Sequence, residues 1–460
     1  MMNENIVTKI RKKHGITQEE LAHTLNVSYT SVNAWETGRR EPQERMKTVL
    51  LDILESDLST HTVGALKSKG INRTDSGFVS SVIDYNLLRD TNPYTHGIGK
   101  WYGTLPSFLV KDLIKFLATD FNNSGDAVVN FSGSGTVPLE LSLAGRQCTA
   151  VDANPMAVLM GRVKTLYKDF SDKALIDSAF QQVVNQSAIT VDKDLFATSN
   201  LITNPNKWIL PEVQNEILRA LSGINHLENR LVRQLFSLAL AVISTEFCSI
   251  DKRCTNHYVY KQPGIFVREK FVDALKSEVY GWLPKFEELR AVDGYVAPEI
   301  YLGDACRLPV RDSSVNLVFS HPPYGTTINY YAINRVSLSI LEVVNLYEHE
   351  AQVPETLAAD CQKTDLSSGT IKRFRQLTPQ WMSEAYRVLN KGGLIVVIIG
   401  DSRDLGKLSH PFTDVIIEGE KLGFVTKEIL IWITNHKAGM HVKRKGHHID
   451  HNYVIIMEKT

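Results

Sequence analysis

Short apolar runs and longer amphipathic segments alternate along most of this chain. The runs at 127–129, 148–151, 300–302, 315–320 and 392–401 are almost continuously apolar. Strands of a parallel sheet have this composition because both of their faces are buried. Segments with apolar residues three and four positions apart separate the runs and predict helices. The pattern therefore predicts an α/β fold around a mostly parallel sheet.

A helical insertion interrupts this alternation at about residues 167–295. Its clearest helices are predicted at residues 213–224, 228–246 and 269–289. The second of these is apolar over much of its surface, and a helix of that kind belongs in a core. We therefore expect it to be buried. Two final strands, at 425–434 and 453–457, are expected to end the sheet as a hairpin.

The amino terminus predicts a separate pair of short helices. Thr17 caps the first helix and is followed three residues later by Glu20, as in a capping box. Ser28 caps the second helix, at residues 29–36. A polar stretch then follows and has the composition of a linker. We expect a helical domain at residues 1–56, a linker at 57–95 and the α/β domain at 96–460.

This helical pair resembles the helix-turn-helix of phage-repressor-type regulators over about residues 4–55. The resemblance implies binding to double-stranded DNA, with the second helix in the major groove and two arginines near phosphates. The residues concerned are Tyr29, Thr30, Ser31 and Asn33, followed by Arg39 and Arg40. Acidic residues balance the cations here, so we expect one copy to bind weakly and a homodimer to bind a palindrome. A solvated helical hairpin is the alternative.

The overall charge of the chain limits how it binds partners. Its 460 residues exceed one compact core, and its 51 Lys and Arg balance its 51 Asp and Glu. Nucleic-acid binding must therefore come from local patches. The segment 436–448 is basic and the segment 253–261 is basic and aromatic, and the alternative for both is a plain surface loop. The histidines of 436–448 lack compact spacing with Cys or carboxylates, so no metal site is predicted.

The spacing of the cysteines indicates the redox environment of the protein. All five are scattered along the chain and show no paired spacing, which suits a reducing environment. The sequence shows no signal peptide and no apolar run of about 18 residues, so we expect no membrane association. These features predict a cytoplasmic protein.

A glycine-rich segment follows the first strand of the α/β region. It consists of Phe131, Ser132, Gly133, Ser134, Gly135 and Thr136, and a predicted helix at 137–144 comes next. Glycines let the backbone approach a ligand closely, and a helix amino terminus favours electronegative groups. The following strand ends in Asp152, well placed to accept hydrogen bonds from ribose hydroxyls. Because no lysine follows the glycines, we expect a nucleoside rather than a triphosphate.

A proline-rich tetrapeptide ends the strand at 315–320. It consists of His321, Pro322, Pro323 and Tyr324. Two consecutive prolines cannot continue a helix or a central strand, so the backbone must turn rigidly. Such a turn offers carbonyl oxygens that accept from an amino group, and an aromatic face on which a planar base can stack. A loop that merely closes the strand is the alternative.

Together these motifs resemble the S-adenosylmethionine-dependent amino methyltransferases of DNA, over about residues 96–460. That family reads D-P-F-x-G-S-G-T at the glycine loop and [DNS]-P-P-[YFW] at the catalytic turn. The resemblance implies a Rossmann-like fold and S-adenosylmethionine as the cofactor. It assigns cofactor binding to Phe131 through Thr136 and to Asp152, Ala153, Asn154, Asp304 and Ala305. The segment 101–106 would cover the methionine end of the cofactor.

The resemblance also implies how the tetrapeptide acts. The target base would be flipped out and stacked on Tyr324. His321 and the Pro322 carbonyl would hold the two amine hydrogens, so that the nitrogen lone pair points at the methyl carbon. Protonated imidazole has no acceptor nitrogen, so the rate should fall below the pKa of His321. The family also has an acid where this chain has Val129, and Asn130 or another residue would have to replace it.

These features favour a site-specific DNA methyltransferase of a restriction-modification or related defence system. A cognate nuclease would then be a partner, and the helix-turn-helix would aid DNA binding or autoregulation. The Ser-x-Pro-Pro-Tyr context slightly favours cytosine-N4 over adenine-N6, and we expect the helical insertion to recognise the target. Two alternatives stay open. One is a catalytically degenerate regulator that senses the cofactor, and the other is an RNA guanine-N2 methyltransferase, which Gly325 would fit.

Overall fold

A computed structural model describes most of the chain in two compact units. The described residues are 5–14, 18, 21, 29–42, 81–84, 92–165, 172–185, 202, 204–250, 265–323, 329–344, 371–404, 407–433 and 451–460. The first unit comprises residues 1–91 and 429–452, and the second comprises residues 92–428 and 453–460.

The first unit contains helices α1 (Ile6–His14) and α3 (Tyr29–Glu36), which pack on each other. Within residues 5–42 of this unit, the described apolar side chains that are buried are Val7, Ile10, Leu21, Val32 and Trp35. Arg11 pairs with Glu36 at 2.7 Å, which ties the two helices together. The bounds of α3 are those predicted for the second helix. Of the helix expected from residue 16 to 22, only residues 18 and 21 are described, both as helical, and the turn at 25–27 lies outside the described residues.

Part of the predicted linker is a strand. Residues 81–84, within the expected linker at 57–95, form β1 (Ser81–Asp84), which runs parallel to residues 430–433 of β9 (Phe424–Ile433). Four residues are too few to show a clear period in the sequence, and a strand this short forms because a neighbouring strand supplies its hydrogen bonds. The expectation of a linker is therefore wrong for residues 81–84.

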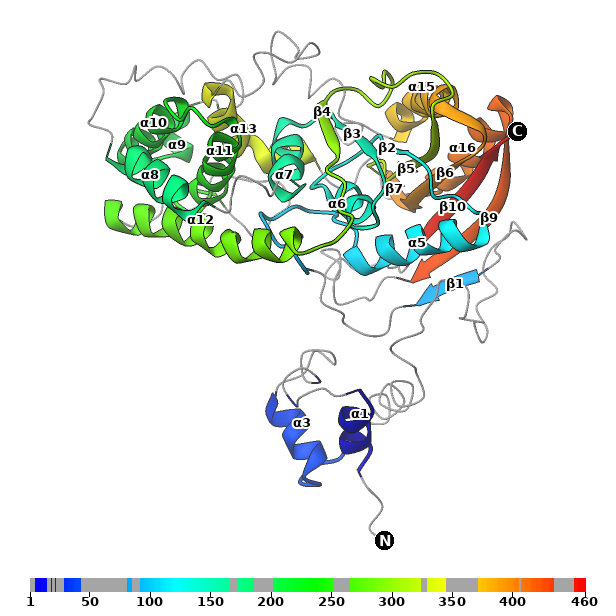
Figure 1. Cartoon of the computed structure of the whole chain (residues 1–460), viewed down its shortest axis with the longest axis horizontal. Coiled ribbons are helices and arrows are strands. Elements are labelled where there is room, and N and C mark those ends of the chain that lie inside the picture. Colours follow the sequence, from blue (N-terminus) through cyan, green and yellow to red (C-terminus); the bar gives the residue numbers. More distant parts are fainter. Residues whose placement is uncertain are drawn as a thin grey trace. The chain divides into compact units, whose positions relative to one another are not determined.

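Beyond β1, the sheet follows the strand order β9-β10-β6-β5-β2-β3-β4 (Figure 1). The strands other than β9 are β2 (Ala127–Val129), β3 (Cys148–Asp152), β4 (Glu299–Leu302), β5 (Val315–Ser320), β6 (Leu389–Gly400) and β10 (His451–Lys459). From β6 to β4 each neighbouring pair is parallel. The predicted fold class, a mostly parallel α/β sheet of Rossmann-like type, is confirmed.

The strand order places the site. The chain runs from β2 outward to β3 and β4, and then returns to β5 on the other side of β2. In open α/β sheets, ligands bind at the carboxyl ends of strands where the order reverses in this way. Here that point lies between β2 and β5, which carry the glycine loop and the proline-rich tetrapeptide at their carboxyl ends.

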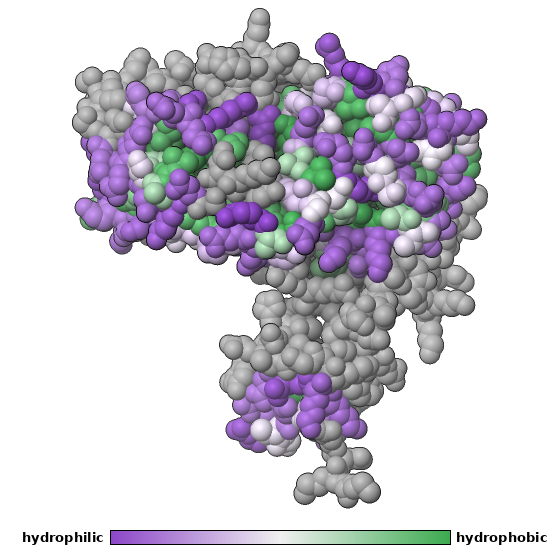
Figure 2. All heavy atoms as spheres, in the orientation of Figure 1, coloured by the Kyte–Doolittle hydropathy of each residue, from purple (hydrophilic) through white to green (hydrophobic). Residues whose placement is uncertain are grey.

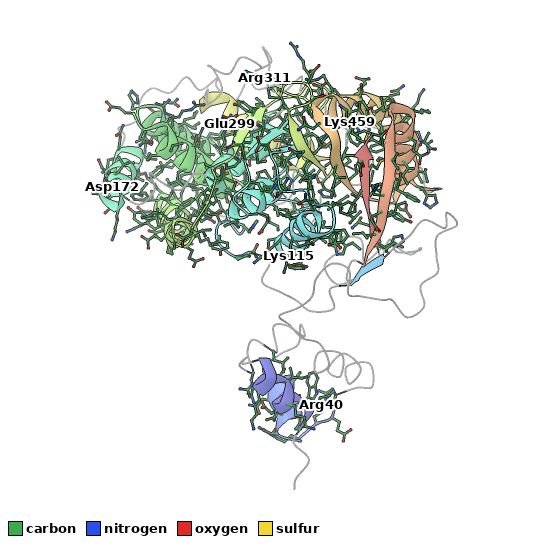
Figure 3. The ribbon with its side chains drawn as sticks, turned by 45° about the vertical axis from the view of Figure 1, so that its right-hand side comes forward. Arg40, Lys115, Asp172, Glu299, Arg311 and Lys459 are labelled. Carbon is green, nitrogen blue, oxygen red and sulfur yellow. The ribbon has the colours of Figure 1, made fainter. Side chains whose placement is uncertain are left out.

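Helices pack along the sheet. They are α5 (Ser107–Asp120), α6 (Thr136–Leu143), α7 (Pro155–Thr165), α15 (Ile371–Val388) and α16 (Pro411–Leu422). α15 contains Pro379, a residue that usually interrupts a helix. The helix nevertheless begins at residue 371, and Phe374 and Thr378 continue its buried face. Lys459 on β10 donates to the carbonyl oxygens of Tyr386 and Leu389, both at 2.7 Å (Figure 3).

The insertion is helical, as predicted. It contains α8 (Lys173–Val184), α9 (Pro205–Trp208), α10 (Pro211–Asn225), α11 (Arg230–Ser244) and α12 (Arg268–Arg290), and α13 (Tyr330–Val344) packs on α11. The side chains of α11 are buried along most of its length, which confirms the expectation drawn from its apolar surface. Hydrophilic side chains cover most of the face shown in Figure 2, with apolar patches between them. None of the described helices is long and apolar enough to cross a membrane.

Candidate active site

The glycine-rich loop adopts a conformation that requires its glycines. Gly133 and Gly135 have φ angles of 49° and 85°, in the left-handed region that other residues rarely adopt. A Cβ atom on Gly135 would also lie 2.7 Å from the Cα atom of Gly161 on α7. The backbone can therefore turn tightly from β2 into α6 and still pack against the next helix.

Asp152 holds this loop from the end of β3. Its Oδ2 atom accepts a hydrogen bond from the backbone N–H of Gly133 at 2.7 Å, and its Oδ1 atom accepts one from Asn154 at 2.9 Å. Asp152 is partly exposed and lines the cavity described below. The carboxylate thus both shapes the loop and borders the space above it.

Asp304 occupies the corresponding place after β4. Its Oδ1 atom accepts from the backbone N–H of Cys306 at 2.9 Å. Burial, together with the negative charge of Asp304, raises the pKa of the Cys306 thiol to about 12. Cys306 is therefore a neutral thiol near pH 7.

The tetrapeptide turn lies beside the glycine loop because β5 and β2 pair in register. Val129 is opposite Phe319, so the next residue of each strand, Asn130 and Ser320, are neighbours. The Ser320 hydroxyl donates to Asn130 Oδ1 at 2.7 Å, and both residues are buried. This contact joins positions 190 apart in the sequence. It brings the ends of the two motifs together.

His321 follows this contact directly. The residue as a whole is partly exposed, but desolvation of its imidazole lowers the pKa to about 4. The side chain is therefore neutral near pH 7, the form that retains an acceptor nitrogen. Pro322 is buried, Pro323 is partly exposed, and Tyr324 lies outside the described residues.

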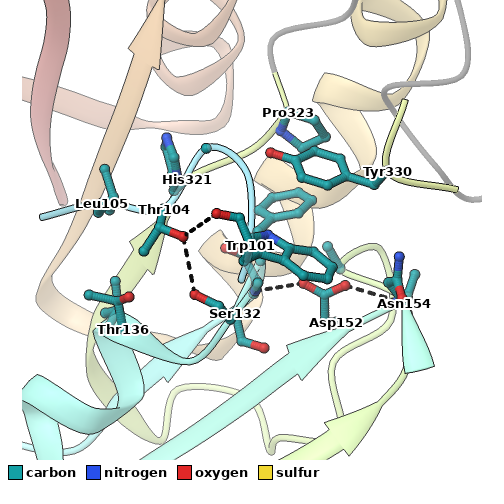
Figure 4. A pocket seen from close by; sticks show the side chains of 18 of the residues that line it. Trp101, Thr104, Leu105, Ser132, Thr136, Asp152, Asn154, His321, Pro323 and Tyr330 are labelled. Atoms are coloured by element: carbon teal, nitrogen blue, oxygen red, sulfur yellow. Dashed lines mark hydrogen bonds between the residues drawn. The ribbon is translucent and has the colours of Figure 1, made fainter. Parts of the chain in front are cut away.

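One cavity of about 290 Å³ brings the two motifs together (Figure 4). Of the residues predicted to bind the cofactor, those lining it are Phe131, Ser132, Gly133, Ser134, Thr136, Asp152, Ala153, Asn154, Asp304 and Ala305. His321 and Pro323 of the predicted catalytic turn line it too, as do Trp101, Gly103, Thr104 and Leu105 of the segment expected to cover the cofactor. Gly135 instead caps α6 and packs against Gly161.

Several further lining residues received no role in the sequence analysis. They are Val137, Cys306, Tyr330, Tyr331, Leu377 and Trp381 on the described part of the wall. Trp381 belongs to α15, and its ring meets that of Phe131 edge to face at 5.6 Å. A tryptophan on an amphipathic helix is indistinguishable in sequence from a core residue. The sequence could have indicated Tyr330 and Tyr331 as cavity residues, because they are aromatic and come soon after the proline turn.

The cavity wall contains buried polar atoms that are suited to a polar ligand. Asn130 Nδ2, Ser132 Oγ and Thr136 Oγ1 are buried and have no hydrogen-bond partner in the described protein. Buried polar groups are normally hydrogen-bonded, so such atoms call for a partner. The amide is a donor and the hydroxyls are donors and acceptors, which fits the carboxylate and ammonium groups of S-adenosylmethionine. Asp152 and Asp304 in turn suit hydroxyl and amino groups of a nucleoside.

In the first unit, the residues predicted to contact DNA lie on α3 and just after it. Arg39 Nη2 donates to Asn33 Oδ1 and Arg39 Nε donates to Thr37 Oγ1, both at 3.1 Å. Arg39 and Arg40 are exposed, and Ser31 and Asn33 are partly exposed. The side chains of Tyr29 and Thr30 lie outside those described. Thus Arg39 is held against the helix that would enter the groove.

Two segments considered in the sequence analysis, 253–261 and 436–448, lie outside the described residues. Within the described ranges, no group of three or more His, Cys, Asp or Glu side chains is arranged to hold a metal ion. Cys148, Cys248 and Cys306 are free thiols.

Comparison with known proteins finds a family match toward each end of the chain. Residues 7–54 match the family model described as helix-turn-helix, and residues 315–460 match the one described as DNA methylase. No curated protein matches the chain.

Solved structures of methyltransferases are similar at low identity. A putative DNA modification methylase from Thermus thermophilus, complexed with S-adenosyl-L-methionine, is 21% identical over 34% of this chain and 51% of that chain, with a TM-score of 0.21. The match thus spans about half the length of that methylase. A SAM-dependent methyltransferase from Methanosarcina mazei is 9% identical over 75% of this chain and 96% of that chain, with a TM-score of 0.29. An rRNA methyltransferase from Streptomyces viridochromogenes is 11% identical over 79% and 90% of the two chains, with a TM-score of 0.30. The chain is thus similar to a helix-turn-helix family over residues 7–54 and to a DNA methylase family over residues 315–460.

Proposed function

We propose that this protein methylates an exocyclic amine of a DNA base, with S-adenosylmethionine as the methyl donor. The observation that carries the proposal is the pairing of Asn130 with Ser320, because it unites the glycine loop and the His321 turn on one cavity. The match of residues 315–460 to the DNA methylase family supports the same reaction class.

The cofactor would be held by residues from three strand ends. The loop from Phe131 to Thr136 would face its methionine part, Asp152 with Ala153 and Asn154 its ribose, and Asp304 with Ala305 its adenine. Bound there, S-adenosylmethionine supplies an electrophilic methyl group. The buried Ser132 and Thr136 hydroxyls then gain the hydrogen-bond partners that the protein does not give them.

The His321 turn would orient the target amine. Neutral His321 accepts one amine hydrogen and the Pro322 carbonyl accepts the other, so that the nitrogen lone pair leaves conjugation with the ring. Tyr324 stacks against the flipped base. Once so oriented, the amine is nucleophilic enough for direct displacement, and no covalent enzyme intermediate is needed.

The finer assignments follow from the motifs. The Ser320-x-Pro-Pro-Tyr context favours cytosine-N4 over adenine-N6. The helical insertion from α8 to α12 would recognise the target sequence. The helix-turn-helix would bind DNA as a homodimer, with Arg39 and Arg40 at phosphates, and would serve autoregulation of a restriction-modification system with a cognate nuclease. Free thiols in the described part of the chain agree with a cytoplasmic location.

Sequencing of modified bases tests the proposal directly. The full chain is expressed in a host that lacks DNA methylation, and its genomic DNA is sequenced for N4-methylcytosine and N6-methyladenine. We expect one modified base at a defined motif, and loss of the modification with Tyr324→Ala and with His321→Ala.

The control is Lys421→Ala, which changes an exposed lysine in the last turn of α16 and should leave methylation intact. An unmodified genome from folded protein that binds the cofactor would refute the enzyme and favour a cofactor-sensing regulator. Modified guanine-N2 in the RNA of the same cells would instead favour an RNA methyltransferase.

A further inference from the structure

Carboxylates are unevenly distributed around the cavity. On the described part of its wall they come from Asp152 and Asp304, which follow β3 and β4. The His321 turn follows β5, on the other side of β2 in the strand order. Toward that side, the described wall contains no carboxylate. A cationic ligand group near the turn must therefore be stabilised in another way.

Aromatic rings occupy the wall at that place. The rings of Trp101 and Tyr330 are stacked, with centroids 5.4 Å apart and an angle of 14° between their planes. Both rings line the cavity, and Figure 4 shows Tyr330 beside Pro323 of the turn. A Cβ atom built on Gly133 would lie 3.5 Å from Trp101 Nε1, so Trp101 also borders the glycine loop. The pair thus spans the distance from the loop to the turn.

We propose that the Trp101–Tyr330 pair recognises the positively charged sulfonium of S-adenosylmethionine through cation–π attraction. The inference rests on the proposed function, because it concerns the same cavity. A methyl donor must place its sulfonium between the loop that holds it and the turn that holds the amine. The described wall offers aromatic rings there, and a ring attracts a cation within about 6 Å of its centroid.

The choice of rings over a carboxylate has a chemical consequence. A carboxylate beside an activated methyl group is itself a nucleophile, whereas an aromatic face stabilises the charge without offering one. The sulfur of the product, S-adenosylhomocysteine, is neutral, so the attraction disappears once the methyl group has left. The pair therefore discriminates the charged cofactor from the neutral product and favours product release.

The test compares binding of the two sulfur compounds to the full chain. Affinities for S-adenosylmethionine and S-adenosylhomocysteine are measured by isothermal titration calorimetry. We expect Trp101→Leu to weaken S-adenosylmethionine binding roughly 3- to 30-fold, as loss of a cation–π contact predicts. S-adenosylhomocysteine binding should weaken much less, so that the ratio of the two affinities falls. Trp101→Phe keeps an aromatic face and should retain most of the ratio.

Phe121→Leu is the control, because Phe121 is a partly exposed aromatic residue at the end of α5 and is not part of the cavity wall. Tyr330→Leu gives an independent measurement if Trp101→Leu does not fold, and should lower the same ratio. Equal loss of both ligands, or an unchanged ratio in the folded variants, overturns the inference and leaves the proposed function standing. If the unaltered chain binds neither compound, the proposed function itself is wrong.

Discussion

At the scale of single residues, the role proposed for His321 depends on its protonation state. Its pKa is lowered from near 6.5 to about 4 by desolvation. We therefore expect the rate of methyl transfer to stay level from pH 8 to about 5.5 and to fall as the pH approaches 4, where imidazolium loses its acceptor. Single-turnover rates between pH 4 and 8 measure this directly.

His321→Asn is the matched variant, because an amide oxygen accepts a hydrogen bond without titrating. It should retain transfer and show a flatter profile below pH 5.5. The same shift affects stability: the unfolded chain binds a proton near pH 6.5 and the folded chain only near pH 4, so protonation favours unfolding between these values. The free energy of unfolding should therefore decrease as the pH is lowered from about 6.5 to about 4. This decrease should be smaller in the variant. A half-loss of rate near pH 6.5 would contradict the assignment.

At the scale of elements, the turn from β2 into α6 depends on Gly135. Its φ of 85° and the 2.7 Å approach of a built Cβ atom to Gly161 leave no room for a side chain. We expect Gly135→Ala to reduce the free energy of unfolding by about 1–3 kcal/mol, a typical cost of such backbone strain. Because the loop must shift, cofactor binding should also weaken. Urea unfolding and calorimetric titration measure the two effects.

Gly281→Ala is the control for this substitution. Gly281 lies inside α12, has an ordinary φ, and a Cβ atom there would meet nothing within 4 Å. Alanine favours a helix interior over glycine by about 0.5–1 kcal/mol, so this variant should be as stable as the parent or more stable. Equal effects of the two substitutions would show that Gly135 is not structurally required.

At the scale of the whole molecule, the two family segments should make separable contributions to DNA binding. Arg39 is exposed and is held by Asn33 and Thr37 next to α3. If it contacts a phosphate, Arg39→Ala should weaken binding of the full chain to duplex DNA and reduce the salt slope by about 1. Fluorescence anisotropy with a random-sequence duplex over a salt series measures both quantities.

Lys9→Ala serves as the control, since Lys9 is an exposed cation of α1 in the same unit. It should leave the salt slope closer to that of the parent. The rate of methyl transfer at saturating DNA should not change with Arg39→Ala, because Arg39 belongs to the first unit and not to the cavity. An unchanged slope with Arg39→Ala would remove it from the DNA contacts.

Local signals in the sequence determined the main elements and the two motifs. The apolar runs at 127–129 and 315–320 became β2 and β5 with those bounds, because burial on both faces marks such strands regardless of context. Gly133 and Gly135 marked the loop because their backbone conformation excludes other residues. His321-Pro322-Pro323 marked the turn because proline fixes the backbone locally.

Only the tertiary structure decided which distant residues meet. Strand pairing brought Asn130 and Ser320 into contact across 190 positions, and helix packing placed Trp381 against Phe131. The tertiary structure also stacked the ring of Trp101 on that of Tyr330, and it formed β1 from residues 81–84 of the expected linker. Such contacts depend on the register and packing of elements far apart in the chain, which no local pattern encodes. The His321 turn was therefore predicted from the sequence, whereas the surroundings that lower the pKa of its imidazole emerged only with the fold.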